Sequence, residues 1–296
     1  MKKYKVWILL ILCVLFWSGN YIFGSLVVSE LTPIGLTFIR WLFASVILLM
    51  VAQKIEKPDW KEVFEQWPKI LALSLFGVTG YNLLLYYALY YTSPLNASLV
   101  NSFNPGLIAI VSAIYLKEKI TMHHIFGIFI SFLGVLIVLT KGNLLQALTT
   151  EYNTGDLLII AAVISWTVYS IISKKLTTVP PITSTGVSGL ITALMLFPFA
   201  MNNGVSYLNM STLALTAVIY IVLFPSMLSF VLWNVGVREI GAAKTGIFLN
   251  LNPVFTAFIS WSMGREITWV QITGGILVFT GVYITTAFKG KPSGIK

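Results

Sequence analysis

Arg40 is the residue best suited to binding chemistry, because it is a single cation among Phe38, Trp41 and other apolar side chains. An arginine at the centre of a membrane helix costs about 2.5–3.5 kcal/mol on an insertion scale, so it should face protein or water. Its planar guanidinium can hold a carboxylate through two parallel hydrogen bonds. Two roles follow for Arg40: contact with an anionic substrate group, or a structural tie to backbone carbonyls.

Two Asn-Pro pairs occupy matching positions in the halves of the chain, within LVNSFNPGLIA around Pro105 and FLNLNPVFTA around Pro253. Proline removes a backbone donor, clashes with the carbonyl four residues earlier and bends a helix. In lipid the freed carbonyl must find another partner. Nearby amides can supply it, join neighbouring helices, or bind a ligand; they belong to Asn101, Asn104, Asn250 and Asn252.

Aromatic and polar residues also recur at helical spacing in both halves. Trp17, Asn20 and Tyr21 share one helix face, and the pattern returns at Trp166 and Tyr169. Two more stretches carry such residues, namely Asn82, Tyr86 and Tyr90 in the first half and Trp233 and Asn234 in the second. These residues either pack between helices or, where they lie in the middle of a span, line a cavity for a flat or apolar ligand.

The composition explains which elements must position these residues. Of the 296 residues 57% are hydrophobic and only 10% are charged, whereas soluble domains average about 25% charged residues. Apolar runs of about 20 residues predict membrane-spanning helices. We expect ten of them, near residues 6–28, 32–53, 68–91, 95–116, 122–140, 156–176, 182–201, 212–237, 243–263 and 269–288. A short amphipathic helix is expected at 54–67, with Trp60 and Trp67 as interfacial anchors.

The net charge of +9 is explained by basic residues on one side of the membrane and gives no reason to expect a nucleic-acid partner. With ten spans, the basic residues outside the spans fall on the side of both termini, except Lys141 and Arg265. Loops rich in lysine and arginine stay in the cytoplasm, so both termini are expected there and the 141–155 loop outside.

Each half contains five expected spans, so the second half enters the membrane from the opposite side. The sequence thus predicts an all-α membrane protein of ten helices arranged as two inverted five-helix repeats, a layout typical of transporters with a substrate site near the midplane. The expected limits are 1–140 for the first repeat, 141–154 for an external linker, 155–290 for the second repeat and 291–296 for a cytoplasmic tail.

The closing parts of the two halves resemble a known family. NPGLIAIVSAIYLKEKIT with GIFISFLGVLIVLT, and NPVFTAFISWSMGREIT with GGILVFTGVYITT, are similar to the end of the EamA domain, in which a span with an early proline ends in Lys-Glu or Gly-Glu and a glycine-rich span follows. The resemblance covers nearly the whole chain. It implies membership of the drug/metabolite transporter superfamily and export or exchange of small metabolites. The second half departs from it in lacking an arginine that matches Arg40.

The remaining ionisable residues and the cysteine give no sign of catalytic or metal-binding chemistry. Acidic residues occur only near span ends, and Glu118 and Glu266 are expected to be end caps or gate ion pairs. His123 and His124 are expected in a solvated turn. The single Cys13 excludes an intramolecular disulfide, and the lack of GxxxxGK[ST] argues against direct use of ATP. We therefore expect no cofactor, metal site or catalytic residue.

The sequence as a whole predicts a secondary transporter of the cell membrane, an exporter or exchanger of small metabolites such as amino acids, that works by alternating access. An intramembrane lipid-modifying enzyme and a channel or sensor are the alternatives. The oligomeric state, coupling ion and transport direction stay open. The expected substrate-binding residues are Trp17, Asn20, Arg40, Tyr86, Asn101, Trp166, Tyr169, Trp233 and Asn250.

Overall fold

The computed structural model describes residues 3–92, 94–145, 153–202, 210–264 and 266–287. Within these ranges the chain is helical and forms no strand. Eight of the helices in the described residues are long and apolar enough to cross a membrane, namely Tyr4–Val27, Pro33–Ile55, Trp67–Ala88, Met122–Thr140, Thr154–Lys175, Pro181–Asn202, Thr212–Ile240 and Trp269–Ala287. The protein is therefore an all-helical, multi-pass membrane protein.

The stretches expected to form the fourth and ninth spans are broken helices. In the first half, α6 (Pro94–Asn101) ends before the Asn-Pro pair and α7 (Asn104–Tyr115) begins at it. In the second half, α14 (Ala242–Gly246) and the 3-10 turn η4 (Ile247–Asn250) precede α15 (Leu251–Ser262). Pro105 and Pro253 lie in the first turns of α7 and α15, where a missing N–H costs little. The asparagine-proline pairs thus start new helices instead of bending continuous ones.

Two other helices contain a π-helical segment, which adds one residue to a turn and changes the face that later residues present. In the first half, η1 (Ser74–Gly80) joins α4 (Trp67–Leu73) to α5 (Tyr81–Ala88). In the second half, η3 (Val222–Ser229) joins α12 (Thr212–Ile221) to α13 (Phe230–Ile240). Both segments lie in the middle of their helices, beside the cavity described below.

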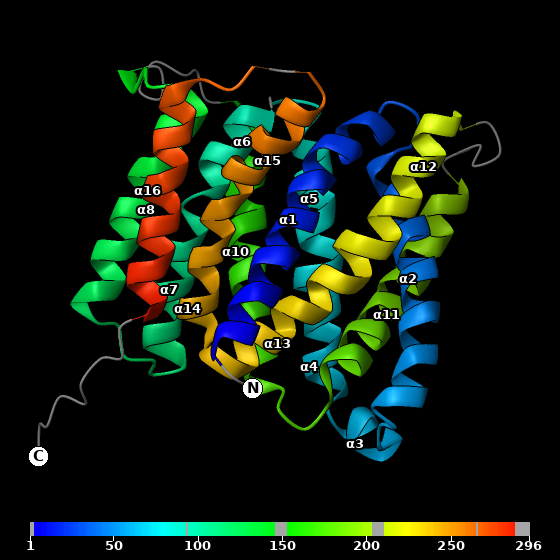
Figure 1. The fold of residues 1–296 in the computed structure, drawn as a ribbon. Coiled ribbons are helices and arrows are strands. Elements are labelled where there is room, and N and C mark those ends of the chain that lie inside the picture. The colour runs from blue at the N-terminus through cyan, green and yellow to red at the C-terminus, as the bar shows by residue number, and fades with distance from the viewer. Residues whose placement is uncertain (1–2, 93, 146–152, 203–209, 265, 288–296) are drawn as a thin grey trace, which may run out of the picture.

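The remaining helices pack in pairs that join the two halves of the chain (Figure 1). The bundle pairs α2 (Pro33–Ile55) with α11 (Pro181–Asn202) and α8 (Met122–Thr140) with α16 (Trp269–Ala287). It also places α1 (Lys3–Val27) along α12, η3 and α13, and α10 (Thr154–Lys175) along α4, η1 and α5. Glycines allow the α8–α16 contact, since a Cβ at Gly134 would lie 2.6 Å from the Gly274 carbonyl oxygen.

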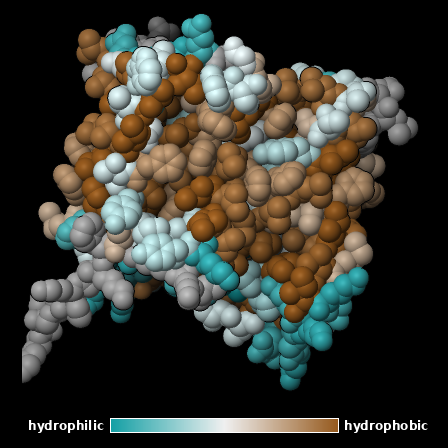
Figure 2. All heavy atoms as spheres, viewed as in Figure 1, coloured by the Kyte–Doolittle hydropathy of each residue, from teal (hydrophilic) through white to brown (hydrophobic). Residues whose placement is uncertain are grey.

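Apolar side chains cover the middle of the bundle, and a group of hydrophilic side chains gathers at one edge (Figure 2). The described chain begins and ends at the same end of the bundle, which we call the N-terminal end (Figure 1). The short helix α3 (Trp60–Glu65) lies there too, and its Phe64 and the adjacent Trp67 are exposed, as expected of residues at a membrane interface.

Candidate functional site

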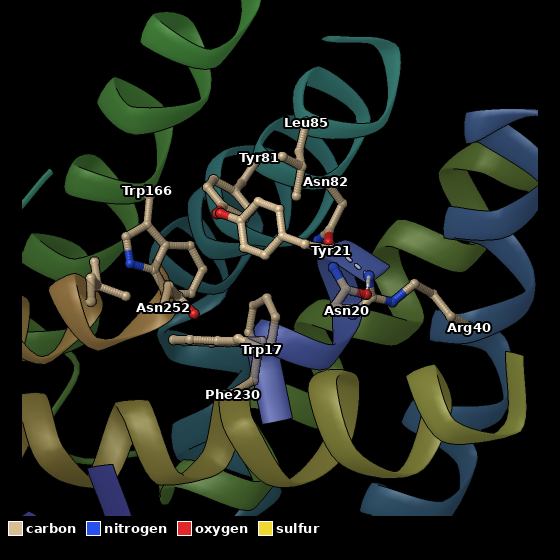
Figure 3. A pocket seen from close by; sticks show the side chains of 11 residues that line it. Trp17, Asn20, Tyr21, Arg40, Tyr81, Asn82, Leu85, Trp166, Phe230 and Asn252 are labelled. Carbon is tan, nitrogen blue, oxygen red and sulfur yellow. Dashed lines mark hydrogen bonds between the residues drawn. The ribbon is translucent and has the colours of Figure 1, made fainter. Parts of the chain in front are cut away.

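A narrow cavity of about 20 Å³ lies where helices of the two halves meet (Figure 3). Aromatic rings form one side of it and a cluster of amides around Arg40 forms the other. The first half contributes residues from α1, α2 and α5, and the second half contributes residues from α10, α13, η4 and α15. Its lining consists of Trp17, Asn20, Tyr21, Arg40, Tyr81, Asn82, Leu85, Trp166, Phe230, Leu249 and Asn252.

Arg40 is almost completely buried, and every hydrogen-bond partner it has among the described residues is neutral. Its Nε donates to Ser226 Oγ at 2.8 Å, and its Nη1 donates to Asn82 Oδ1 at 3.0 Å. Nη1 also contacts Tyr86 OH and, at 3.4 Å, Asn20 Oδ1. None of these bonds uses Nη2, so the guanidinium keeps donor capacity and an uncompensated charge beside the cavity.

The neighbours of Arg40 are themselves held in place. Asn82 turns its oxygen to the guanidinium because its Nδ2 donates to the Val78 carbonyl at 2.7 Å. Ser226 donates to the Ile221 carbonyl five residues earlier, at 2.7 Å, and accepts from Arg40 with the same oxygen. That carbonyl is within reach because η3 widens the helical turn. The π-helical segment therefore helps to fix the guanidinium.

The other wall of the cavity is a cluster of aromatic rings. Trp17 and Trp166 meet edge to face with ring centroids 5.0 Å apart, and both contact Phe230. Trp17 is oriented by a hydrogen bond from Nε1 to the Pro225 carbonyl at 3.2 Å. Trp166 is 2% exposed, and its Nε1 has no partner among the described residues. This wall suits an apolar or flat group, and such edge-to-face pairs add about 0.5–1.5 kcal/mol of stability each.

A second polar cluster lies between these rings and the N-terminal end of the bundle, and we call it the inner cluster. It consists of Tyr169, Ser173, Thr185 and Asn234. Asn234 Oδ1 accepts from Tyr169 OH at 3.1 Å and from Ser173 Oγ at 2.7 Å, while its Nδ2 donates to Thr185 Oγ1 at 3.0 Å. The amide of Asn234 is thus saturated by side chains of α10 and α11, and the cluster ties three helices together.

The expected substrate-binding residues fall into three groups. Trp17, Asn20, Arg40 and Trp166 line the cavity. The next layer contains Tyr86, which contacts Arg40, Tyr169, which stacks on Trp166, and Trp233, which donates to Ser170. Asn101 and Asn250 are buried outside the lining, and Asn250 donates to Ser131 at 3.0 Å. The Asn250 bond joins two helices, but its Oδ1 has no hydrogen-bond partner among the described residues, so a role of Asn250 in substrate binding stays a prediction.

Sequence reasoning left several lining residues out of the expected set. Asn82 and Asn252 were recognisable as polar residues in apolar stretches, and Asn252 accepts a hydrogen bond from Ser18 at 3.0 Å. Tyr21 and Tyr81 approach each other with hydroxyls 3.4 Å apart. Phe230 directly follows the π-helical segment η3 and Leu249 lies within the 3-10 turn η4, and no sequence signal distinguished them from ordinary core residues.

Two other expectations concern the N-terminal end. Glu118 caps the start of α14, because its carboxylate accepts from the backbone N–H groups of Ala242 and Ala243 at 3.0 Å each. This is the first of the two roles expected for it, an end cap or a gate ion pair. Its counterpart Glu266 is exposed. The expectation for His124 was wrong, since its side chain is 2% exposed: α8 starts at Met122 and carries His124 into the bundle.

Together these features define a helical membrane protein with a buried, positively charged cavity between its two halves. The chain belongs to the EamA-like transporter family, which matches residues 5–140 and again residues 153–287. This confirms the family resemblance seen in the sequence.

Relatives agree with this assignment, and a solved structure shares the fold. The chain is 30% identical to the uncharacterized transporter YyaM of Bacillus subtilis (strain 168), over 95% of this chain and 93% of that protein. It is also 30% identical to an uncharacterized transporter of Archaeoglobus fulgidus, over 96% of this chain and 98% of the relative. A solved structure, titled only as the crystal structure of a protein, has the same fold, with a TM-score of 0.79, 19% identity and coverage of 96% of this chain and 98% of the other.

Proposed function

We propose that the protein is a secondary transporter that moves small metabolites, such as amino acids, across the cell membrane by alternating access. The family and the names of the relatives favour a transporter over a lipid-modifying enzyme or a channel. The observation that carries the proposal is the buried Arg40, whose partners are neutral and whose Nη2 is unused beside a cavity that both halves line. A substrate carboxylate would supply the missing counter-charge.

The proposed architecture has ten crossings in two inverted five-helix repeats, within residues 1–140 and 155–290. The pairing of helices supports it, because α1 packs along the interrupted helix of the second half and α10 along that of the first. The two broken helices, α6 with α7 and α14 with α15, occupy matching places and would provide the fourth and ninth crossings. In such a layout, rocking of one repeat against the other exposes a central site to each side in turn.

A counterflow experiment tests the function. The purified protein in liposomes loaded with one unlabelled amino acid should exchange it for the labelled form, and a panel of zwitterions, carboxylates and amines would define the class. Trp17→Ala and Trp166→Ala should each slow exchange, because they remove one wall of the cavity. The proposal fails if no member of the panel exchanges, or if both variants insert normally and transport at the wild-type rate.

The orientation is proposed on the distribution of lysine and arginine, with both termini in the cytoplasm. Labelling of intact cells with an impermeant maleimide tests it. In a Cys13→Ala background, Asn143→Cys should react and Asp59→Cys should not. Both positions are exposed, so access to the reagent depends on the side of the membrane. The reverse pattern would overturn the orientation.

A further inference from the structure

A second, larger pocket opens at the N-terminal end of the bundle, separate from the cavity that contains Arg40. Its volume is about 450 Å³, and it lies where the α7–α8 connection meets the end of α10 and the α13–α14 junction. Three lysines line it, namely Lys119, Lys174 and Lys244. Residues of both halves form its walls, as they do for the central cavity, but here cationic side chains predominate over aromatic rings.

The acidic residues of this pocket already have partners. Each carboxylate oxygen of Glu118 accepts a backbone N–H group at the start of α14. Glu239 also lines the pocket and is engaged in an interaction. Lys174 donates to the Arg238 carbonyl at 2.7 Å, which uses one of the three hydrogens of its ammonium group. The lysines therefore keep donors that the pocket's acids do not occupy.

His124 supplies an independent sign of a ligand. Its side chain is 2% exposed and lines the pocket, and its Nε2 has no hydrogen-bond partner among the described residues. Its Nδ1 lies 3.4 Å from Thr121 Oγ1. In the tautomer in which Nδ1 accepts the Thr121 proton, Nε2 carries a hydrogen that it can donate. A buried polar atom without a partner costs about 1–3 kcal/mol, so an occupant that accepts this hydrogen would be stabilised.

We propose that this pocket binds a phosphate group through Lys119, Lys244 and His124. A phosphate monoester or diester offers several acceptor oxygens and at least one negative charge, which matches several separate ammonium donors better than a single carboxylate does. The same chemistry has two sources: a soluble phosphate compound, or the headgroup of an anionic lipid. A lipid can reach the site because Tyr115, Met122 and Phe126, which lie within three residues of lining residues in the sequence, are exposed apolar side chains.

Thermal unfolding of the purified full-length protein in detergent tests the soluble source. Inorganic phosphate, added at constant ionic strength against chloride, should raise the melting temperature of the wild type by mass action. The double variant Lys119→Gln/Lys244→Gln should bind phosphate about 100-fold more weakly, because it removes two charge-assisted hydrogen bonds. Lys175→Gln is the matched control, since Lys175 follows Lys174 on α10, is exposed and does not line the pocket.

Nanodiscs test the lipid source. With mixed phosphatidylglycerol and phosphatidylcholine, native mass spectrometry should find phosphatidylglycerol retained on the wild type and on Lys175→Gln, and depleted on the double variant. Retention of the lipid without a phosphate effect in detergent assigns the site to a lipid headgroup, and the converse assigns it to a soluble phosphate. The proposal is overturned if the double variant matches the wild type in both experiments. Lys244→Arg, which keeps the charge, should bind in whichever arm the wild type binds.

Discussion

The two interrupted helices place similar asparagines in different surroundings. Asn82 follows η1 and Asn234 follows η3, and both are buried. Asn82 accepts from Arg40 at the edge of a cavity, whereas Asn234 has its oxygen and nitrogen occupied by hydroxyl groups of neighbouring helices. The asparagine of the first half therefore bonds to a cation, whereas that of the second half bonds only to neutral groups.

This difference indicates that the Arg40 cluster can bind a ligand, whereas the inner cluster holds helices together. A saturated amide network such as the inner cluster fixes the helices that it connects, since every donor and acceptor already has a partner. The Arg40 cluster is satisfied in part, and it retains a charge that neutral partners cannot compensate. We therefore expect substrate selectivity to depend on the Arg40 side and stability to depend on the inner cluster.

Removal of the charge gives the largest expected effect on transport. Arg40→Gln should lower the rate for a carboxylate substrate about 100-fold, which corresponds to the loss of one charge-assisted interaction worth about 3 kcal/mol. Arg238→Gln is the matched control, because Arg238 caps the Val179 carbonyl at 2.6 Å, away from the cavity. Counterflow rates per inserted protein measure both, and equal losses in the two variants would contradict the comparison.

A larger side chain at Gly77 tests whether stability depends on the inner cluster. A Cβ at Gly77 of η1 would overlap the Tyr169 ring, which is stacked on Trp166 and bonded to Asn234. Gly77→Ala should therefore destabilise the protein by about 1–3 kcal/mol, the usual cost of overpacking. Gly106→Ala provides the control, since apart from its chain neighbours and the nearby backbone of its own helix no described atom would lie within 4 Å of the added Cβ. A lower melting temperature is expected for the first variant only, and unchanged stability of Gly77→Ala would mean that Tyr169 is not held rigidly.

The smallest expected effect concerns a carboxylate at the end of the bundle opposite the inner cluster. Glu30 accepts from Ser211 Oγ at 2.6 Å and from Ser211 N at 2.8 Å, and these bonds lower the pKa of Glu30. Since the folded protein favours the ionised form, the stabilisation is present at neutral pH and is lost as the pH falls through this lowered pKa.

Melting temperatures of the wild type and Glu30→Gln measure this contribution. They should differ slightly at about pH 7 and converge towards about pH 3. Because Glu30 is exposed, the difference should also shrink at high salt. A difference that grows on acidification would show that the Ser211 contact does not favour the ionised carboxylate.

The sequence predicted the helical membrane fold and part of the cavity for physical reasons. Trp17 and Trp166 were recognisable because they lie at matching places in regular helices, where spacing defines a face. Arg40 was recognisable because a cation in an apolar helix is costly.

The other positions depend on irregular turns. η3 brings Ser226 to Arg40, and η4 directs Asn250 towards Ser131 and away from the cavity. Neither shift follows from a regular helical period. The burial of His124 was missed for a related reason, because two adjacent histidines on a helix point in different directions and the sequence did not indicate which one faced the bundle.

The most direct test of the account compares the affinity for a transported amino acid with that for its carboxamide, in the wild type and two Arg40 variants. The wild type should prefer the carboxylate by about tenfold or more. Arg40→Lys should reduce that preference, because an ammonium lacks the planar fork, and Arg40→Gln should abolish it. Equal preference for the carboxylate in all three folded proteins would contradict the account and would make Arg40 a purely structural residue.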